Sequence, residues 1–277
     1  MNSLNIIGAG RVGQTLGRLW TAADVFEVRS VLARSAASAQ VAVGVIGAGQ
    51  AAPNLAALPE ADVWMLSVPD AQITPTAQAL AALTAPAGTV RPALAFHCSG
   101  ALGSDVLAPL RMAGWQVASA HPLLSFARPE LAATQFAGSP CALEGDAIAL
   151  AALEAVFTPI GGQCFTLSAQ DKLLYHAGAV LATNFLPVLQ DLAEQLWQRT
   201  GMPVELARQM RATLLQNAVN NIVGLGPQAA LTGPAARGDT DLVTRQTQAV
   251  AAWNPDAGAA YAALSQLASQ LARRKPG

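Results

Sequence analysis

The sequence is poor in charge and in aromatic side chains. Of its 277 residues, 12% are Asp, Glu, Lys or Arg and 5% are aromatic, and the net charge is −1. Without a basic surface field, the chain is not expected to bind nucleic acid or an anionic membrane. A run of about 18 apolar residues, as a membrane span requires, is also missing. The longest candidate is interrupted at His176, Asn184 and Pro187.

Cysteine is scarce and does not occur in a paired pattern. The chain has three cysteines, an odd number, at Cys98, Cys141 and Cys164. They are widely spaced and form no C-x-x-C motif. This distribution favours reduced thiols over a disulfide framework. The apolar run that begins at Leu4 follows no charged segment and no cleavage site, so no secretory signal is expected. Together these absences predict a soluble cytoplasmic protein.

Apolar residues make up 52% of the chain, and their pattern divides it into two parts. Up to residue 167, short apolar runs alternate with helical segments, which predicts an α/β domain with a right-handed doubly wound parallel sheet. After Ser168 only helical patterns follow, so residues 168–277 are expected to form an all-α domain. The predicted strands are 4–7, 27–32, 62–68, 93–96, 116–120, 141–143 and 163–166, and the predicted long helices are 169–200, 204–223, 239–252 and 257–273.

A glycine motif lies between the first strand and the first helix. Residues 7–13 read IGAGRVG, which places Gly8, Gly10 and Gly13 in a G-x-G-x-x-G spacing. In this context Gly8 makes the turn, Gly10 lets the backbone approach a pyrophosphate, and Gly13 lets the helix pack on the strand. The helix N-terminus then offers amide donors to phosphate. The predicted cofactor-binding residues are Gly8, Gly10, Arg11, Val12, Gly13, Arg34, Ser35, Ser67 and Pro69.

The end of the second strand indicates which dinucleotide is bound. An acidic residue there would bind the ribose hydroxyls of NAD. The chain instead has Ala33, Arg34 and Ser35, so Arg34 is a candidate partner for a 2′-phosphate and Ser35 for a hydrogen bond to it. NADP is therefore the favoured cofactor over NAD. A solvated surface role for Arg34 is the alternative.

Histidine and lysine are rare, and their positions are informative. His97 and His121 each follow a predicted strand, at the sheet edge where ligands bind in open α/β folds. His176 lies four residues after Lys172, and this spacing puts both side chains on one helix face. Burial of such a cationic pair would lower both pKa values, which suits proton transfer. Structural roles for His97, His121 and Lys172 remain open. A metal site is not expected, because the histidines come from three separate elements.

Near the C-terminus, residues 230–239 read ALTGPAARGD and end in the adhesion tripeptide Arg237-Gly238-Asp239. With no export signal expected, an adhesion role is not expected either. Gly233, Pro234 and Gly238 predict a turn between helices. We expect Thr232 and Arg237 in this turn to touch substrate.

Four segments together resemble the Rossmann-like/DUF2520 family of candidate NADP-dependent oxidoreductases. They are HCSGALGSDVL (97–107), AHPLLSF (120–126), DKLLYHAGAV (171–180) with the following Asn184, and ALTGPAARGD (230–239). The chain is more distantly similar to pyrroline-5-carboxylate reductases, ketopantoate reductases and β-hydroxyacid dehydrogenases. Lys172-x-x-x-His176 resembles a Lys-x-x-x-Asn pair of the last group, with His in place of Asn. Ser99 and His121-Pro122 resemble a Ser and a His-Pro of prephenate dehydrogenases.

These features predict an NADP-dependent oxidoreductase that transfers a hydride between nicotinamide and a small carbonyl, imine or hydroxy-acid substrate bound between the two domains. The expected catalytic residues are His121, Lys172, His176 and Ser99, with Lys172 or His121 exchanging the proton. The expected substrate-binding residues are Asn184, Thr232 and Arg237, with Arg237 pairing with a carboxylate. The alternatives are a dinucleotide sensor without turnover and a deazaflavin (F420)-dependent reductase. Ala- and Leu-rich helices in the second domain also predict a homodimer.

Overall fold

The structure is a computed structural model that describes residues 2–84 and 93–274. Near its C-terminus the sequence has a short basic cluster, Arg273-Arg274-Lys275, of which Lys275 lies outside these ranges. The chain divides into two compact units, one ending at Leu181 and the other beginning at Ala182. The predicted domain boundary at residue 167 lies directly after the last strand. The first compact unit continues beyond it and includes helix α7 (Lys172–Ala179).

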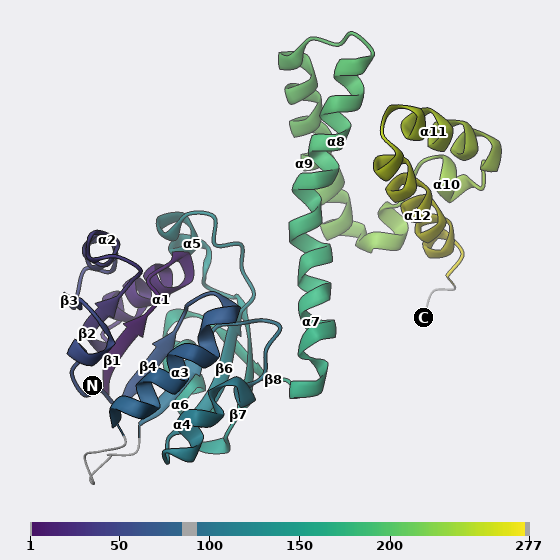
Figure 1. The fold of residues 1–277 in the computed structure, drawn as a ribbon. Coiled ribbons are helices and arrows are strands. Elements are labelled where there is room, and N and C mark those ends of the chain that lie inside the picture. Colours follow the sequence, from purple (N-terminus) through teal and green to yellow (C-terminus); the bar gives the residue numbers. More distant parts are fainter. Residues whose placement is uncertain (1, 85–92, 275–277) are drawn as a thin grey trace. The chain divides into compact units, whose positions relative to one another are not determined.

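The first unit is an eight-stranded sheet with helices on both faces (Figure 1). Its strand order is β3-β2-β1-β4-β5-β6-β7-β8. The order reverses between β1 and β4, and ligands of such sheets bind where the order reverses. The predicted α/β fold class is therefore confirmed. The strands are β1 (Asn2–Ile7), β2 (Phe26–Leu32), β3 (Gln50–Ala51), β4 (Val63–Leu66), β5 (Leu94–His97), β6 (Gln116–Pro122), β7 (Pro140–Gly145) and β8 (Gln163–Thr166).

Two apolar cores, one on each face of the sheet, explain the continuous apolar strands. In β4, for example, Val63 and Met65 join the core on one face and Trp64 and Leu66 join the other. Helices α1 (Arg11–Ala22), α2 (Ala36–Ile46) and α6 (Ala147–Phe157) cover the first face, whereas α3 (Asp70–Thr84) and α4 (Ala108–Met112) cover the second. Successive strand residues alternate between the faces, so a strand covered on both sides has no polar face.

The sheet is parallel, as predicted, except at one strand pair. β7 runs antiparallel to β6, with Pro122 opposite Cys141 and Ala118 opposite Gly145. The 17-residue connection, which contains α5 (Pro129–Gln135), returns the chain at the edge where β6 ends instead of crossing the sheet. β8 is again parallel to β7, and α6 forms the crossover between them.

The predicted helix over 169–200 is interrupted. Between α7 and α8 (Phe185–Arg199), residues Val180–Asn184 form a π-helical turn. Pro187 explains the break, because its nitrogen has no hydrogen to donate to the carbonyl of residue 183 and its ring crowds that carbonyl. Side chains before and after this turn therefore do not share one 3.6-residue periodicity.

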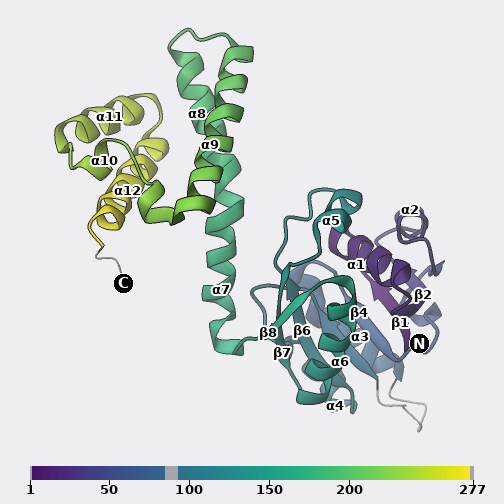
Figure 2. The ribbon, with the colours of Figure 1, turned by 180° about the vertical axis from the view of Figure 1, so that it is seen from behind.

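The described residues of the second unit form helices joined by short turns. α8 and α9 (Val204–Ala230) lie antiparallel and side by side, as both views show (Figures 1 and 2). Gly226, with φ 78°, and Pro227 break α9 near its end. The remaining helices are α10 (Pro234–Arg237), α11 (Thr240–Trp253) and α12 (Pro255–Ala272), which pack on one another. Among the described helices, none combines the length and the apolar character that a membrane crossing needs.

Candidate functional site

The glycine loop has the geometry that dinucleotide binding requires. Gly8 has φ 90°, and a Cβ there would lie 2.6 Å from the Val68 nitrogen. A Cβ on Gly13 would lie 2.7 Å from the Gly8 oxygen, so only glycine allows α1 to approach β1 this closely. Gly10 is exposed, and no atom lies within 4 Å of the position its Cβ would take. The loop thus leaves open space at Gly10, beside the free amides at the start of α1.

The electrostatic surroundings of this loop suit a phosphate. The first turn of α1 contains no acidic residue, and Arg11 is exposed at its first position. Arg34 is exposed just after β2, and Ser35 caps α2 by accepting a hydrogen bond from the Ser38 nitrogen at 3.2 Å. Residues 33–49, which follow β2, contain no Asp or Glu. The residues present therefore fit a dinucleotide. In folds of this kind the ribose lies near the end of the second strand, which Arg34 and Ser35 follow here.

Two predicted cofactor residues follow β4. The Ser67 hydroxyl donates to the Gly8 carbonyl oxygen, and the Ser67 nitrogen donates to the Ile7 oxygen at 2.8 Å. Ser67 therefore fixes the glycine loop to the neighbouring strand. Pro69 is exposed immediately before α3, and its carbonyl accepts from the Gln72 nitrogen at 2.7 Å.

His97 ends β5 and is fully buried. Its Nδ1 accepts from the Ser99 nitrogen at 3.2 Å, and its Nε2 lies 3.0 Å from the Gly103 carbonyl oxygen. Because Nδ1 accepts a hydrogen bond, the single proton of the neutral ring must be on Nε2. Nε2 then donates to the Gly103 carbonyl oxygen. Burial lowers the pKa of His97 to about 4 despite the Gly103 contact. His97 is therefore a neutral group that shapes the β5 loop.

Ser99 holds the same loop through its hydroxyl. The hydroxyl donates to Asp70 Oδ2 at 2.9 Å and accepts from the nitrogens of Ala101 at 3.2 Å and Leu102 at 3.1 Å. Asp70 is exposed at the start of α3, so this contact joins the ends of β4 and β5. With its hydrogen-bonding capacity used in this way, Ser99 orients the loop, and Asp70 is the polar group that the sequence reading missed.

Lys172 extends from the first turn of α7 into the sheet and is 1% exposed. Its ammonium donates to the Ser119 hydroxyl at 2.6 Å and to the Ser99 carbonyl oxygen at 3.1 Å. Burial lowers the pKa of Lys172, whereas the nearby carboxylates of Glu144 and Asp70 act in the opposite direction. The ammonium thus joins α7 to β5 and β6, with Ser119 as a second partner that the sequence did not reveal.

His121 and His176 come together beside Gly100. The two rings meet edge to face, with centroids 5.6 Å apart. A Cβ on Gly100 would lie 2.4 Å from His176 Nδ1 and 2.9 Å from His121 Nε2, so the absence of a side chain there allows both rings to reach the loop. His121 Nδ1 lies 3.0 Å from the Tyr175 hydroxyl. His176 Nδ1 is buried and has no hydrogen-bond partner among the described residues.

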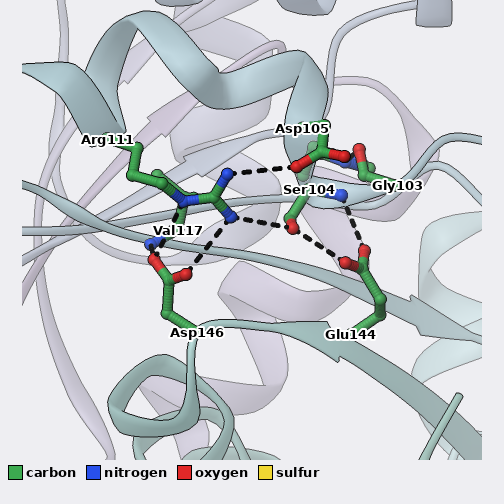
Figure 3. A network of polar contacts seen from close by, with 8 residues as sticks. Gly103, Ser104, Asp105, Arg111, Val117, Glu144 and Asp146 are labelled. Atoms are coloured by element: carbon green, nitrogen blue, oxygen red, sulfur yellow. Dashed lines mark hydrogen bonds and ion pairs between the residues drawn. The ribbon is translucent and has the colours of Figure 1, made fainter. Parts of the chain in front are cut away.

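A second polar network holds the residues that follow Gly103 in this loop (Figure 3). The carboxylate of Glu144 on β7 accepts from the Ser104 nitrogen at 2.6 Å and from the Ser104 hydroxyl at 2.8 Å. Arg111 donates to the Ser104 hydroxyl at 3.2 Å and pairs with Asp146 at 3.2 Å. Because Gly103 precedes Ser104, these contacts also hold the carbonyl that His97 binds. Within 2–84 and 93–274, no group of three or more His, Cys, Asp or Glu residues is arranged to hold a metal ion.

The predicted substrate-binding residues belong to the second unit. Asn184 closes the π-helical turn and accepts from the Thr183 hydroxyl at 2.7 Å. Thr232 and Arg237 are exposed around α10, which begins after Gly233 with φ 98° and ends before Gly238 with φ 76°. Asp239 of the Arg-Gly-Asp tripeptide caps α11 by accepting from the Leu242 nitrogen at 3.1 Å. The tripeptide therefore forms the predicted turn between helices.

Comparison with known families identifies both halves of the chain. A Rossmann-like domain model matches residues 2–122, and the DUF2520 model, a domain of unknown function, matches residues 139–268. The chain therefore carries a Rossmann-like domain followed by a DUF2520 domain. This confirms the resemblance that the four sequence segments indicated. No curated protein matches this DUF2520 chain.

Solved structures share the fold over nearly the full length of the chain. A candidate NADP oxidoreductase of Bacteroides fragilis is 20% identical with a TM-score of 0.77, and a protein of Thermotoga maritima is 24% identical with a TM-score of 0.74. Pyrroline carboxylate reductase of Plasmodium falciparum, solved with NADP bound, is 12% identical with a TM-score of 0.60. Each match covers 97% of this chain and 98% of the other. At these identities the likeness shows the fold that the DUF2520 chain shares with them.

Proposed function

We propose that this chain is an NADP-dependent oxidoreductase acting on a small carbonyl, imine or hydroxy-acid substrate. One observation carries the proposal. The open glycine loop after β1 and the cluster of Asp70, Ser99, His121 and His176 lie at the same edge of one sheet, across the point where the strand order reverses. A dinucleotide whose pyrophosphate lies at Gly10 extends along this edge in folds of this kind. The structural neighbours described as NADP oxidoreductases or solved with NADP bound support the choice of cofactor.

The cofactor, when bound, donates or accepts the hydride. The protein residues position the substrate and move the proton. His121 is half-buried and reaches the loop through Nε2, so we assign it the hydrogen bond or proton transfer to the substrate heteroatom. Lys172 already donates to two protein oxygens, which makes it a positioning group for Ser99 and Ser119 in this proposal. Burial, His176 and Lys172 lower the pKa of His121 to about 4, so the ring is neutral near pH 7.

An absorbance screen tests the proposal. Wild-type protein is mixed with NADPH and small ketones, keto acids and cyclic imines, and with NADP and the matching hydroxy acids, and absorbance of the reduced nicotinamide is followed. The expected result is turnover with at least one class, reduced about 10²-fold or more in His121→Ala with unchanged NADPH affinity. Turnover that survives in His121→Ala contradicts the role of His121. NADPH binding without turnover in any class would favour the sensor alternative.

The second unit supports the further proposal of a homodimer. Several large apolar side chains on α9 are exposed, including Val223 at 82% and Leu225 at 63%. Large apolar side chains exposed together on one helix are characteristic of association sites. Light scattering is expected to give twice the 28.4 kDa chain mass for the wild type and one chain mass for Val223→Glu, whereas Val41→Glu on α2 leaves the dimer intact. A monomeric wild type contradicts this proposal.

A further inference from the structure

Tyr175 contacts the ring that the proposed function places at the substrate. Its hydroxyl lies 3.0 Å from His121 Nδ1, and the two rings meet edge to face at 5.6 Å. Phe165 packs against the other side of Tyr175, with centroids 6.1 Å apart. Tyr175 is thus fixed by ring contacts as well as by the hydrogen bond. The sequence reading gave it no role.

The direction of this hydrogen bond decides what His121 can do. A neutral imidazole carries one proton, so one ring nitrogen donates and the other accepts. Burial raises the pKa of Tyr175 to about 12, so its hydroxyl keeps its proton near neutral pH. Within the described ranges, that hydroxyl has no acceptor other than His121 Nδ1. A phenol is a stronger donor than acceptor, which favours donation from the Tyr175 hydroxyl to Nδ1.

We propose that Tyr175 is a positioning residue that fixes His121 as the neutral tautomer with its proton on Nε2. Nε2 is the nitrogen beside Gly100 and next to the His176 ring. His121 therefore presents an N–H donor to the substrate. In this tautomer Nε2 cannot act as a base. This inference rests on the proposed function only in placing the substrate there.

The tautomer narrows the substrate class. An N–H donor stabilises a carbonyl oxygen and the negative charge that grows on it as a hydride arrives at its carbon. A protonated imine has no acceptor for such a donor. We therefore assign the reacting carbon an oxygen substituent, as in a ketone, an aldehyde or the corresponding alcohol. In reduction, the hydride from reduced nicotinamide forms the new C–H bond, the C=O π bond breaks, and the oxygen accepts the hydrogen bond of His121 Nε2 while it takes its proton from solvent water.

Nitrogen NMR of histidine reads the tautomer without any substrate. The chain has three histidines, and selective ¹⁵N labelling separates a proton-bearing ring nitrogen from an acceptor nitrogen by its chemical shift. His97 is an internal reference, because its Nδ1 accepts from the Ser99 nitrogen and its proton lies on Nε2. The expected spectrum of the wild type near neutral pH shows His121 with its proton on Nε2. Signals are assigned with single His→Gln variants.

Tyr175→Phe is the decisive variant because it keeps the ring and removes the hydroxyl. His121 is expected to become a mixture of tautomers, while His97 is unchanged. Tyr261→Phe, the change at the only other tyrosine of the chain, is the matched control and leaves His121 unaltered. A wild-type His121 with its proton on Nδ1, or a Tyr175→Phe spectrum identical to the wild type, overturns the proposal.

Kinetics separate this inference from the proposed function. With a carbonyl substrate, Tyr175→Phe is expected to lower kcat/KM about tenfold while NADPH affinity is unchanged. Turnover of imines but not of carbonyl compounds overturns the assignment of substrate class. A complete absence of turnover contradicts the proposed function, whereas the tautomer is still decided by the NMR spectrum.

Discussion

Burial of His97 makes the stability of the fold depend on pH, by an amount that follows from its pKa. The folded protein holds this group at a pKa of about 4, compared with 6.5 for an unperturbed histidine. Below pH 6.5 the unfolded chain therefore binds a proton that the folded chain does not bind. The free energy of unfolding falls as the pH drops from 6.5 through 4. With about 1.36 kcal/mol for each unit, the full loss is about 3 kcal/mol.

The variant that isolates this effect is His97→Gln, which does not titrate and keeps an N–H that can donate to Gly103. Between pH 7 and pH 5, the wild type is expected to lose about 2 kcal/mol more than the variant. His121 also titrates but is present in both proteins, so the difference reports on His97. Urea unfolding, followed by tryptophan fluorescence at several pH values, provides the measurement. Parallel pH dependences for the two proteins would refute the assignment of a buried, neutral His97.

Three substitutions test other parts of the site. Lys172→Met removes the ammonium that joins Ser99 and Ser119; we expect a loss of about 1–3 kcal/mol in urea unfolding and lower turnover, and wild-type turnover would contradict a positioning role. Arg34→Gln is expected to weaken NADPH binding about tenfold or more but not NADH binding, and the exposed Arg18→Gln is its control. Equal losses for both cofactors would contradict recognition of the 2′-phosphate. Arg237→Ala is expected to raise KM for an acidic substrate with kcat retained, and an unchanged KM would contradict its pairing with a carboxylate.

The geometry of the glycine loop could be predicted because each glycine has a local reason. Gly8 needs a positive φ, Gly13 a close approach of helix to strand, and Gly10 open space, and all three needs follow from the strand–turn–helix context. The position of Arg34 after β2 followed in the same way. These features depend on neighbours in sequence, which a pattern can represent.

The polar cluster depended on contacts between distant segments, and the sequence could show only its ingredients. His97 and His121 both follow strands, yet Gly103 and Ser99 bind both nitrogens of His97 while His121 meets Tyr175. The four-residue spacing of Lys172 and His176 correctly indicated one helix face. The spacing could not show that the Lys172 ammonium would donate its hydrogen bonds to oxygens of the protein. The reversal of β7 was missed because strand direction depends on the path of a connection, which apolar pattern does not record.

Binding of NADPH at the glycine loop is the central claim, and Gly10→Asp tests it most directly. Gly10 has φ −76° and precedes α1 as its cap, so aspartate fits the backbone and is a favoured capping residue. Its carboxylate would face the pyrophosphate, where two charges about 4–5 Å apart repel by roughly 3–4 kcal/mol at an effective dielectric of about 20. In calorimetric titration, the account predicts that the wild type binds NADPH and that Gly10→Asp, with an unchanged or higher Tm, binds it at least about 10²-fold more weakly. Equal affinity of the two proteins for NADPH, or no binding by the wild type, would contradict the account.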